Sequence, residues 1–234
     1  MNRMVLRFFC TFVLCYGFIP AAFAITGQEV LAEIQTRYEK TTDLEAKFVQ
    51  EYIGKVMRSP QSGQGQVYFK KKGMMRWDYR VPHQQLITNG KTLWYYQPEE
   101  QQVFVSEISM VIQEKTPLAF LAGEGDLNRD FKVGNFNDAV SPKEENYVID
   151  LIPREPNAAL AKLVLAVDKK TFLVTQVDVI DGLGNVTRTR FIDIKTDVGL
   201  SAVLFNFAVP SGTEVLKFQE PAVPAPPVKG PTKK

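Results

Sequence analysis

Residues that carry reactive chemistry are scarce in this sequence of 234 residues. It has only two cysteines, Cys10 and Cys15, and a single histidine, His83. Both cysteines lie in a leader segment that we expect to be removed. The remaining chain then offers no disulfide and no thiolate nucleophile or metal ligand. His83 follows Pro82 among polar residues, which is typical of an exposed turn.

The sequence also lacks a serine nucleophile motif, a metal-ligand cluster and a phosphate-binding loop. We therefore expect a protein that is not an enzyme and that has no catalytic residue, metal site or cofactor. One catalytic class stays open, because many aspartates and glutamates remain and paired carboxylates can hydrolyse glycosides. A carboxylate-pair hydrolase is kept as an alternative for that reason.

Net charge is nearly absent as well. The chain has 28 basic and 26 acidic residues. Arg3 and Arg7 are the only charged residues among the first 24, so 26 of each sign remain after them. Proteins that bind nucleic acids normally show a basic excess or a basic patch. The densest basic group, Lys70 to Lys72, is short and is interpreted as a solvated strand end. We therefore expect no nucleic-acid partner.

Long apolar runs are confined to the beginning of the chain. Two arginines precede the apolar run Phe8–Ile19, and Ala22–Ala24 then offers small residues at the spacing of a cleavage site. A membrane-spanning helix would need roughly 20 apolar residues. We expect residues 1–24 to be a signal peptide, and residues 25–219 to form one secreted domain. Cys15 lies in the middle of the run, which argues against lipid attachment there.

Hydrophobic spacing predicts one early helix followed by β structure. Thr26 and Glu29 have the spacing of a capping box, and Leu31, Ile34 and Tyr38 recur at helical intervals, which predicts a helix over 26–40. From residue 44 onward the period falls to two, which indicates strands. Strands are predicted at Leu44–Tyr52, Val67–Lys71, Met74–Arg80, Leu86–Thr88, Leu93–Gln97, Val103–Ile108, Phe131–Phe136, Tyr147–Pro153, Ala161–Asp168, Leu173–Asp181, Val186–Lys195 and Phe205–Val209.

Turns and one further helix separate these strands. Asn89-Gly90 predicts a type I′ hairpin turn, which needs positive φ at both central residues, and Lys72-Gly73 predicts another turn. The segment TPLAFLAG at residues 116–123 has a cap, an early proline and a final glycine, and it predicts a short apolar helix. The stretch 220–234 is rich in proline and is expected to be an extended tail.

These elements predict a mainly β fold. Short strands with an amphipathic helix must bury one apolar face against another layer. We expect a large, strongly curved antiparallel sheet, an unclosed half-barrel, that is covered by the N-terminal helix and by short inserted lid helices. Repeat periods of a solenoid or propeller are absent from the sequence.

Five motifs, in order along the chain, resemble the LolA family, the periplasmic carrier proteins for outer-membrane lipoproteins. The strand pair GQVYFKKKGMMRWDYRVP at 65–82 is followed by the hairpin QLITNGKTLWYYQP at 85–98. Leu44–Gln50 is similar to the family's A-x-F-x-Q strand, residues 116–122 to its TP-x-x-L-L helix, and Phe205–Val215 to its closing F-x-F-x-P-P-x-G-V segment. Each motif alone is weak, but their order over the whole mature chain is specific.

The resemblance implies a periplasmic protein that holds the acyl chains of lipoproteins in an apolar hollow and moves them from the inner to the outer membrane. Its implied partners are acylated lipoproteins, an inner-membrane lipoprotein-releasing ABC transporter and an outer-membrane lipoprotein acceptor, and the carrier is expected to be a monomer. For any single apolar residue, an ordinary place in the core is the simpler interpretation. The residues expected to line the hollow as a set are Phe48, Met75, Trp77, Tyr79, Trp94, Tyr96, Leu118, Phe120 and Leu121.

Two positions depart from the family's pattern. Where the family has an Arg-Pro pair after the second strand, this chain has Lys71 and Lys72. The resemblance implies that Lys71 replaces the arginine that latches the lid through backbone carbonyls. Lysine offers one ammonium group instead of a planar fork of donors, so we expect a weaker latch or no latch at all. Met75 replaces an aromatic residue near the mouth. A lipid or lipoprotein sensor on the same fold stays open as an alternative function.

Overall fold

The computed structural model describes residues 25–56, 59–108, 125–137, 145–155 and 158–217. The expected signal peptide, the helix predicted at 116–123 and the proline-rich tail lie outside the described residues. Three residues assigned to the hollow, Leu118, Phe120 and Leu121, are therefore not placed. None of the helices within the described ranges is long and apolar enough to cross a membrane.

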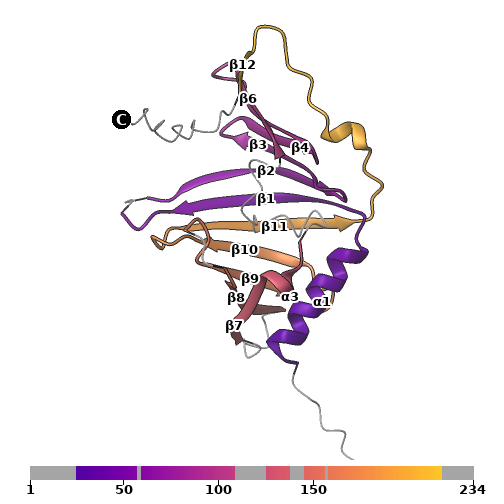
Figure 1. The fold of residues 1–234 in the computed structure, drawn as a ribbon, viewed down its shortest axis with the longest axis vertical. Coiled ribbons are helices and arrows are strands. Elements are labelled where there is room, and N and C mark those ends of the chain that lie inside the picture. Colours follow the sequence, from indigo (N-terminus) through magenta and orange to yellow (C-terminus); the bar gives the residue numbers. More distant parts are fainter. Residues whose placement is uncertain (1–24, 57–58, 109–124, 138–144, 156–157, 218–234) are drawn as a thin grey trace, which may run out of the picture.

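Within the described residues, twelve strands form one curved sheet that does not close on itself (Figure 1). The strands are β1 (Asp43–Ile53), β2 (Gln61–Lys70), β3 (Met74–Val81), β4 (Gln84–Asn89), β5 (Thr92–Gln97), β6 (Gln102–Glu107), β7 (Phe131–Asn137), β8 (Asn146–Pro153), β9 (Lys162–Asp168), β10 (Val174–Ile180), β11 (Val186–Thr196) and β12 (Glu214–Lys217). Their order is β12-β6-β5-β4-β3-β2-β1-β11-β10-β9-β8-β7. All neighbouring pairs are antiparallel except β12 and β6. The mainly β, unclosed fold predicted from the sequence is confirmed.

The predicted N-terminal helix is α1 (Gly27–Lys40), and its capping box is present. The Thr26 hydroxyl accepts a hydrogen bond from the backbone N–H of Glu29, and the Glu29 carboxylate accepts one from the Thr26 N–H. The pKa of Glu29 is lowered because its carboxylate accepts hydrogen bonds from the Thr26 N–H and from the Thr26 hydroxyl. One face of α1 is buried against β7–β11, where it covers the lower half of the sheet (Figure 1).

The two faces of the sheet differ in chemistry. We call the face of β1 that carries Leu44, Ala46 and Phe48 the inner face, because these residues belong to the main core. The opposite, outer face carries ion pairs between neighbouring strands. Asp178 is 6 % exposed, and the Arg188 guanidinium donates to its carboxylate at 2.6 Å. The alternation of side chains along each strand fixes this division.

The closing strand predicted at Phe205–Val209 is wrong. Residues 202–205 form a short 3₁₀ helix, η2 (Ala202–Phe205), and the last strand is β12, parallel to β6. Phe205 is fully buried, and the Arg76 guanidinium donates to the Leu204 carbonyl at 3.1 Å. The alternating aromatics of this segment pack against the outer face of the sheet instead of pairing with a strand edge. Alternation alone does not separate these two cases.

One turn type also differs from the prediction. The register pairs Thr88 with Leu93, so Gly90 and Lys91 are the central residues of the β4–β5 hairpin. Only Gly90 has positive φ there, which is the pattern of a type II′ turn instead of type I′. The Asn89 side chain accepts hydrogen bonds from the backbone N–H groups of Lys91 and Thr92. The turn predicted at Lys72-Gly73 is confirmed.

Candidate functional site

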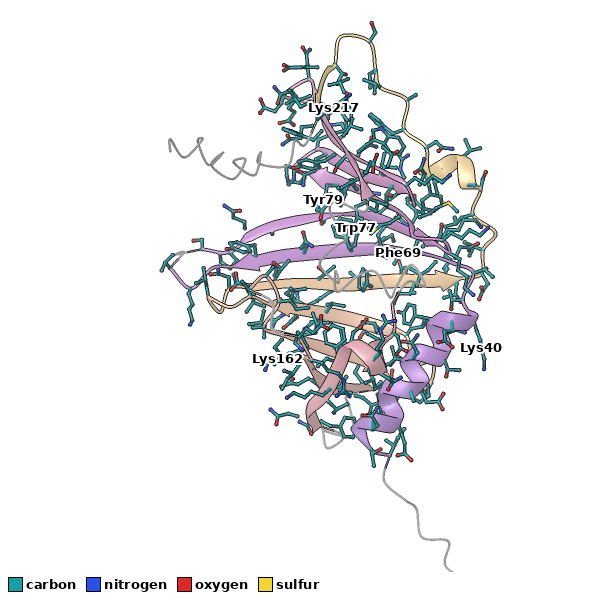
Figure 2. The ribbon with its side chains drawn as sticks, viewed as in Figure 1. Lys40, Phe69, Trp77, Tyr79, Lys162 and Lys217 are labelled. Carbon is teal, nitrogen blue, oxygen red and sulfur yellow. The ribbon has the colours of Figure 1, made fainter. Side chains whose placement is uncertain are left out.

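An aromatic cluster occupies the inner face where β1, β2, β3 and β11 meet. The Phe48 ring lies edge-on to Trp77 and to Tyr79, with centroids 4.7 Å and 4.8 Å apart. Phe69 and Phe191 contact the same indole at 5.8 Å and 6.2 Å. Figure 2 shows Phe69, Trp77 and Tyr79 in a row across the strands. These five residues are called the inner cluster.

Glycines in β2 make room for the inner cluster. The register places Gly65 between Phe48 of β1 and Tyr79 of β3. A methyl group on Gly65 would lie 1.9 Å from the Asp78 carbonyl oxygen and 3.0 Å from the Phe48 ring. A methyl group on Gly63 would lie 3.2 Å from the Tyr79 ring. Glycine weakens a strand, but here it lets two aromatic rings lie over the backbone of β2.

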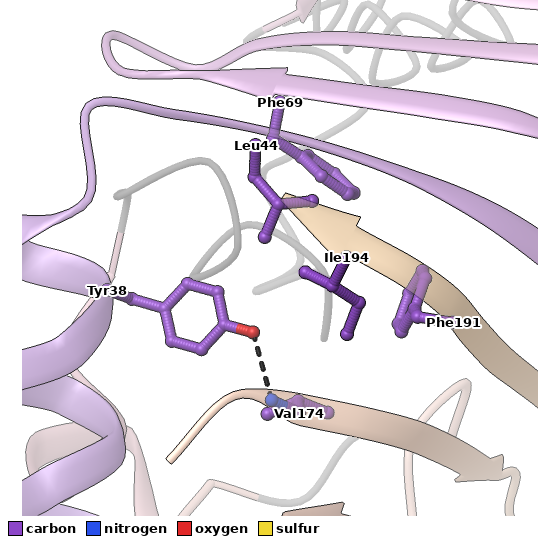
Figure 3. A pocket seen from close by; sticks show the side chains of 6 residues that line it. All are labelled: Tyr38, Leu44, Phe69, Val174, Phe191 and Ile194. Carbon is purple, nitrogen blue, oxygen red and sulfur yellow. Dashed lines mark hydrogen bonds between the residues drawn. The ribbon is translucent and has the colours of Figure 1, made fainter. Parts of the chain in front are cut away.

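The inner cluster continues into an apolar pocket between α1 and the sheet (Figure 3). The pocket is lined by Tyr38, Leu44, Phe69, Val174, Phe191 and Ile194. Its free space has no room for a water molecule, so the side chains fill it in this state. The Tyr38 hydroxyl accepts a hydrogen bond of 3.1 Å from the Val174 N–H, and burial raises the pKa of Tyr38. The phenol thus stays neutral and joins α1 to β10.

A row of polar side chains follows the inner cluster on the same face. The Tyr79 hydroxyl donates to Gln50 Oε1 at 3.0 Å, and Gln50 Nε2 donates to Thr189 Oγ1 at 3.0 Å. Burial, and to a smaller extent the nearby Tyr95, raises the pKa of Tyr79 to about 12. The Tyr79 phenol is therefore a neutral donor at physiological pH. The row crosses β3, β1 and β11.

The structure brings together four of the residues predicted to line the hollow and separates two others. Phe48, Trp77 and Tyr79 belong to the inner cluster, and Met75 packs against the main core on the same face. The register pairs Trp77 with Leu86 and Leu86 with Tyr95. The side chains of residues 94 and 96 therefore point to the outer face.

Trp94 and Tyr96 belong to a second aromatic group on the outer face. The Phe207 ring lies 6.4 Å from Trp94 and 5.2 Å from Tyr96. Ile87, which pairs with Trp94, is fully buried there, as is Phe205. We call these five residues the outer cluster. The sequence shows which side chains alternate within each hairpin. Which face of one hairpin continues the inner face of the next depends on the loop between them, so the sequence did not predict that Trp94 and Tyr96 lie on the outer face.

Lys71 makes contacts with α1. Its ammonium donates to the carbonyl of Glu39 in the last turn of α1, and its backbone N–H donates to the Thr42 carbonyl at 3.1 Å. A cation at a helix C-terminus satisfies a carbonyl that lacks a partner within the helix. Lys71 thus joins the β2–β3 turn to the end of α1. A contact with the segment predicted as a lid falls outside the described residues.

Sequence reasoning missed several residues of this site. Phe69, Phe191 and Val174 line the pocket, and Gln50 and Thr189 form the polar row. Four of the five lie at inward parity in predicted strands, and that parity was the available signal. Val174 reaches the inner face through a β-bulge between Val174 and Gln176, which the sequence does not show. Parity does not show which inward residues lie next to Phe48, because it does not reveal that β11 lies beside β1 in the sheet. Among the described residues, no group of three or more His, Cys, Asp or Glu side chains could hold a metal ion.

The chain is similar in sequence to curated outer-membrane lipoprotein carrier proteins. A curated outer-membrane lipoprotein carrier protein of Azotobacter vinelandii is 31% identical over 182 residues, which cover 76% of this chain and 84% of the relative. One of Methylococcus capsulatus is 26% identical over 206 residues, which cover 88% and 94%. An uncharacterized conserved protein of Thermus thermophilus has a similar fold, with a TM-score of 0.50 at 15% identity over 81% of this chain and 98% of that chain.

The family model agrees with both curated relatives. The model for the outer membrane lipoprotein carrier protein LolA matches residues 39–208. This range includes nearly all of the sheet, the inner cluster, the polar row and Lys71. The chain belongs to the LolA family of outer-membrane lipoprotein carrier proteins.

Proposed function

We propose that this protein carries lipoproteins through the periplasm with their acyl chains held against the inner face of the sheet. The family consists of carriers and not of enzymes. The observation that supports the proposal best is the continuity of the inner cluster with the apolar pocket under α1. Together they offer an apolar surface that runs across five strands and one helix.

The energetics favour a carrier whose hollow is closed when it is empty. Burial of one methylene contributes about 0.8 kcal/mol, so one long acyl chain gains roughly 12 kcal/mol. Two or three fully buried chains would exceed the practical limit of about 20 kcal/mol for non-covalent binding, and release would be too slow. A hollow filled by its own side chains must first be opened, and the cost of opening lowers the net affinity. The filled pocket between α1 and the sheet supports this mechanism.

The proposed cycle runs from the inner to the outer membrane. After removal of residues 1–24 the carrier begins at Ile25, acts as a monomer and receives the acylated lipoprotein from an inner-membrane ABC transporter. It then delivers the lipoprotein to an outer-membrane acceptor. Transfer in this direction needs an acceptor that buries the acyl chains more favourably than the carrier does.

The proposal is tested by binding of a fluorescent fatty-acyl probe and its displacement by a purified lipoprotein. Trp77→Glu places a charge in the apolar wall, and we expect the probe affinity to fall tenfold or more, because an unpaired buried charge is costly. Trp94→Glu is the matched control on the outer face and should leave the affinity within about twofold. Met75→Glu, at a half-buried position, replaces Trp77→Glu if that variant does not fold. Wild-type affinity in a folded inner-face variant would contradict the proposal.

A further inference from the structure

The polar row of Gln50, Tyr79 and Thr189 has no role in holding hydrocarbon. It lies on the inner face directly beside Phe48 and Trp77, where a purely apolar wall would suffice for acyl chains. We infer that this row is a binding subsite for the ester and amide carbonyl groups that join the acyl chains to the lipoprotein's N-terminus. The inference rests on the proposed function and extends it to the linkage region of the ligand.

The donors needed for such a subsite are present. The amide of Gln50 has two N–H groups, and the described contacts use one of them, toward Thr189. The Thr189 hydroxyl accepts that bond and keeps its own O–H as a donor. The Tyr79 hydroxyl supports the row, because its bond to Gln50 Oε1 fixes which way the amide points. Carbonyl oxygens of esters and amides are acceptors only, so the row complements them.

The position of the row along β1 agrees with this role. The inner-face residues follow in the order Leu44, Ala46, Phe48, Gln50 and Tyr52. Leu44 lines the closed pocket, whereas Tyr52, at the other end, is 37% exposed. Six residues of strand separate Leu44 from Gln50, or about 20 Å, which is close to the length of an extended long acyl chain. A chain whose end reaches the pocket therefore has its carbonyl group beside Gln50.

The inner face also offers a matched comparison farther along the sheet. The Tyr95 hydroxyl donates to Gln84 Oε1 at 2.7 Å, which repeats the Tyr79–Gln50 pair on β5 and β4. Gln84 is half-buried, as Gln50 is. Gln84 lies on β4 opposite Tyr79, at the edge of the inner cluster, and Tyr95 stacks on Phe104 at 6.2 Å. The pair on β4 and β5 thus has the same chemistry on the side of the inner cluster that is away from β1 and the closed pocket.

The experiment compares two synthetic ligands that differ only in their carbonyl groups. One is a peptide with an N-terminal dipalmitoylglyceryl cysteine, and the other is its ether-linked dihexadecyl analogue. We expect wild type to bind the ester-linked peptide roughly fivefold more tightly, because ether oxygens are weaker acceptors. Gln50→Leu should remove this preference and leave the affinity for the ether-linked peptide within about twofold. Gln84→Leu should keep the preference. Thr189→Val is the second variant if Gln50→Leu does not fold.

The outcomes separate the subsite from the carrier function. If wild type binds both ligands equally, or if Gln50→Leu keeps the ester preference, the subsite is wrong and the carrier function stands. If wild type binds neither ligand, nor the fatty-acyl probe, both are wrong. Loss of the preference in Gln50→Leu together with its retention in Gln84→Leu supports the subsite.

Discussion

The inner and the outer aromatic clusters contain the same kinds of side chain, but different material covers them. Over the outer cluster the chain itself returns, with Phe205 fully buried and Phe207 packed on Trp94 and Tyr96. Over the inner face, among the described residues, α1 covers the part beside β7–β11 and reaches Leu44 and Phe69 at the pocket, and the aromatic surface continues to a row of hydrogen-bonding side chains. Aromatic content alone therefore does not distinguish the two faces, and the proposed function assigns the acyl chains to the face that α1 covers.

The two covers are also fastened differently. The segment that leads to the outer cluster is held by Asp43, which is 3% exposed and accepts hydrogen bonds from the backbone N–H groups of Val198, Gly199 and Leu200 at 2.8–3.2 Å. The end of α1 is held by the ammonium of Lys71, by the Arg37 guanidinium, which donates to Thr196 Oγ1 at 2.9 Å, and by the Tyr38 hydroxyl, which accepts from the Val174 N–H. A buried carboxylate that accepts from three backbone N–H groups holds its segment more strongly than these separate single bonds do. We therefore expect the outer cover to stay closed and α1 to be the movable one.

The largest expected difference between the clusters comes from one matched pair of substitutions. Phe48→Ala and Phe205→Ala each remove a ring that is at most 1% exposed, and each should lower the free energy of unfolding by about 3–5 kcal/mol. Only Phe48→Ala enlarges the hollow, so it should raise the affinity for the fatty-acyl probe about fivefold, because an empty apolar cavity accepts apolar ligands. Denaturant unfolding and probe titration measure the two quantities. Equal probe affinities in the two variants would remove the distinction between the clusters.

The second expected effect concerns the fastening of the outer cover. Asp43→Asn removes the charge and one of the acceptor oxygens, and should lower the free energy of unfolding by about 1.5–3 kcal/mol, without change in probe affinity. Asp193→Asn is the control, because Asp193 forms a salt bridge with Lys47 in which both side chains are more than half exposed. Such a pair contributes about 0–1 kcal/mol. If the Asp43 variant changed ligand binding, the outer segment would be part of the opening motion.

Much of the fold could be predicted from the sequence, because local patterns determine it. The capping box at Thr26 gave the start of α1, and the period of two gave most strands to within a few residues. The first half of β2 was missed, because Gly63 and Gly65 argue against a strand. Gly65 is required by the backbone carbonyl of Asp78 on β3, and both glycines lie close to the rings of Phe48 or Tyr79, which come from other strands. A tertiary requirement of this kind leaves no local pattern.

The site was predicted only in part for a similar reason. Met75, Trp77 and Tyr79 share a face because they alternate along β3, and Phe48 of β1 joins them because β2 pairs with both strands. Placing residues 94 and 96 needs the register of two further hairpins. A shift of one residue reverses the face of every side chain in a strand. The residues Pro82 and His83, which connect β3 to β4, form no turn motif that predicts this register.

A third effect is dependence on pH at the junction of α1 and β1. The pKa of Asp197 is lowered, first because its carboxylate accepts a hydrogen bond from the Thr42 N–H and then because it accepts one from the Thr42 hydroxyl. A lowered folded-state pKa gives stability that is present above the ordinary aspartate pKa and is lost as the pH falls through the folded value. Asp197→Asn should therefore lose less stability than wild type between about pH 5 and pH 3. The free energy of unfolding of both proteins is measured by denaturant unfolding at several pH values. An equal loss in both proteins over this range would contradict the assignment.

The smallest expected effect concerns Lys71 and the movable cover. Its ammonium donates to the Glu39 carbonyl, so Lys71→Leu should loosen α1 slightly and change probe affinity less than about threefold, since a charge-assisted bond near the surface is weak. Lys71→Arg can reach further carbonyls of the last turn with its planar fork. It should stabilise the closed state and lower the apparent affinity, because closure competes with binding. Lys72→Leu, at the next residue, is the control. If Lys71→Arg binds the probe more tightly than wild type, Lys71 does not hold the carrier closed, and a contact with a lipid headgroup or partner becomes the better interpretation.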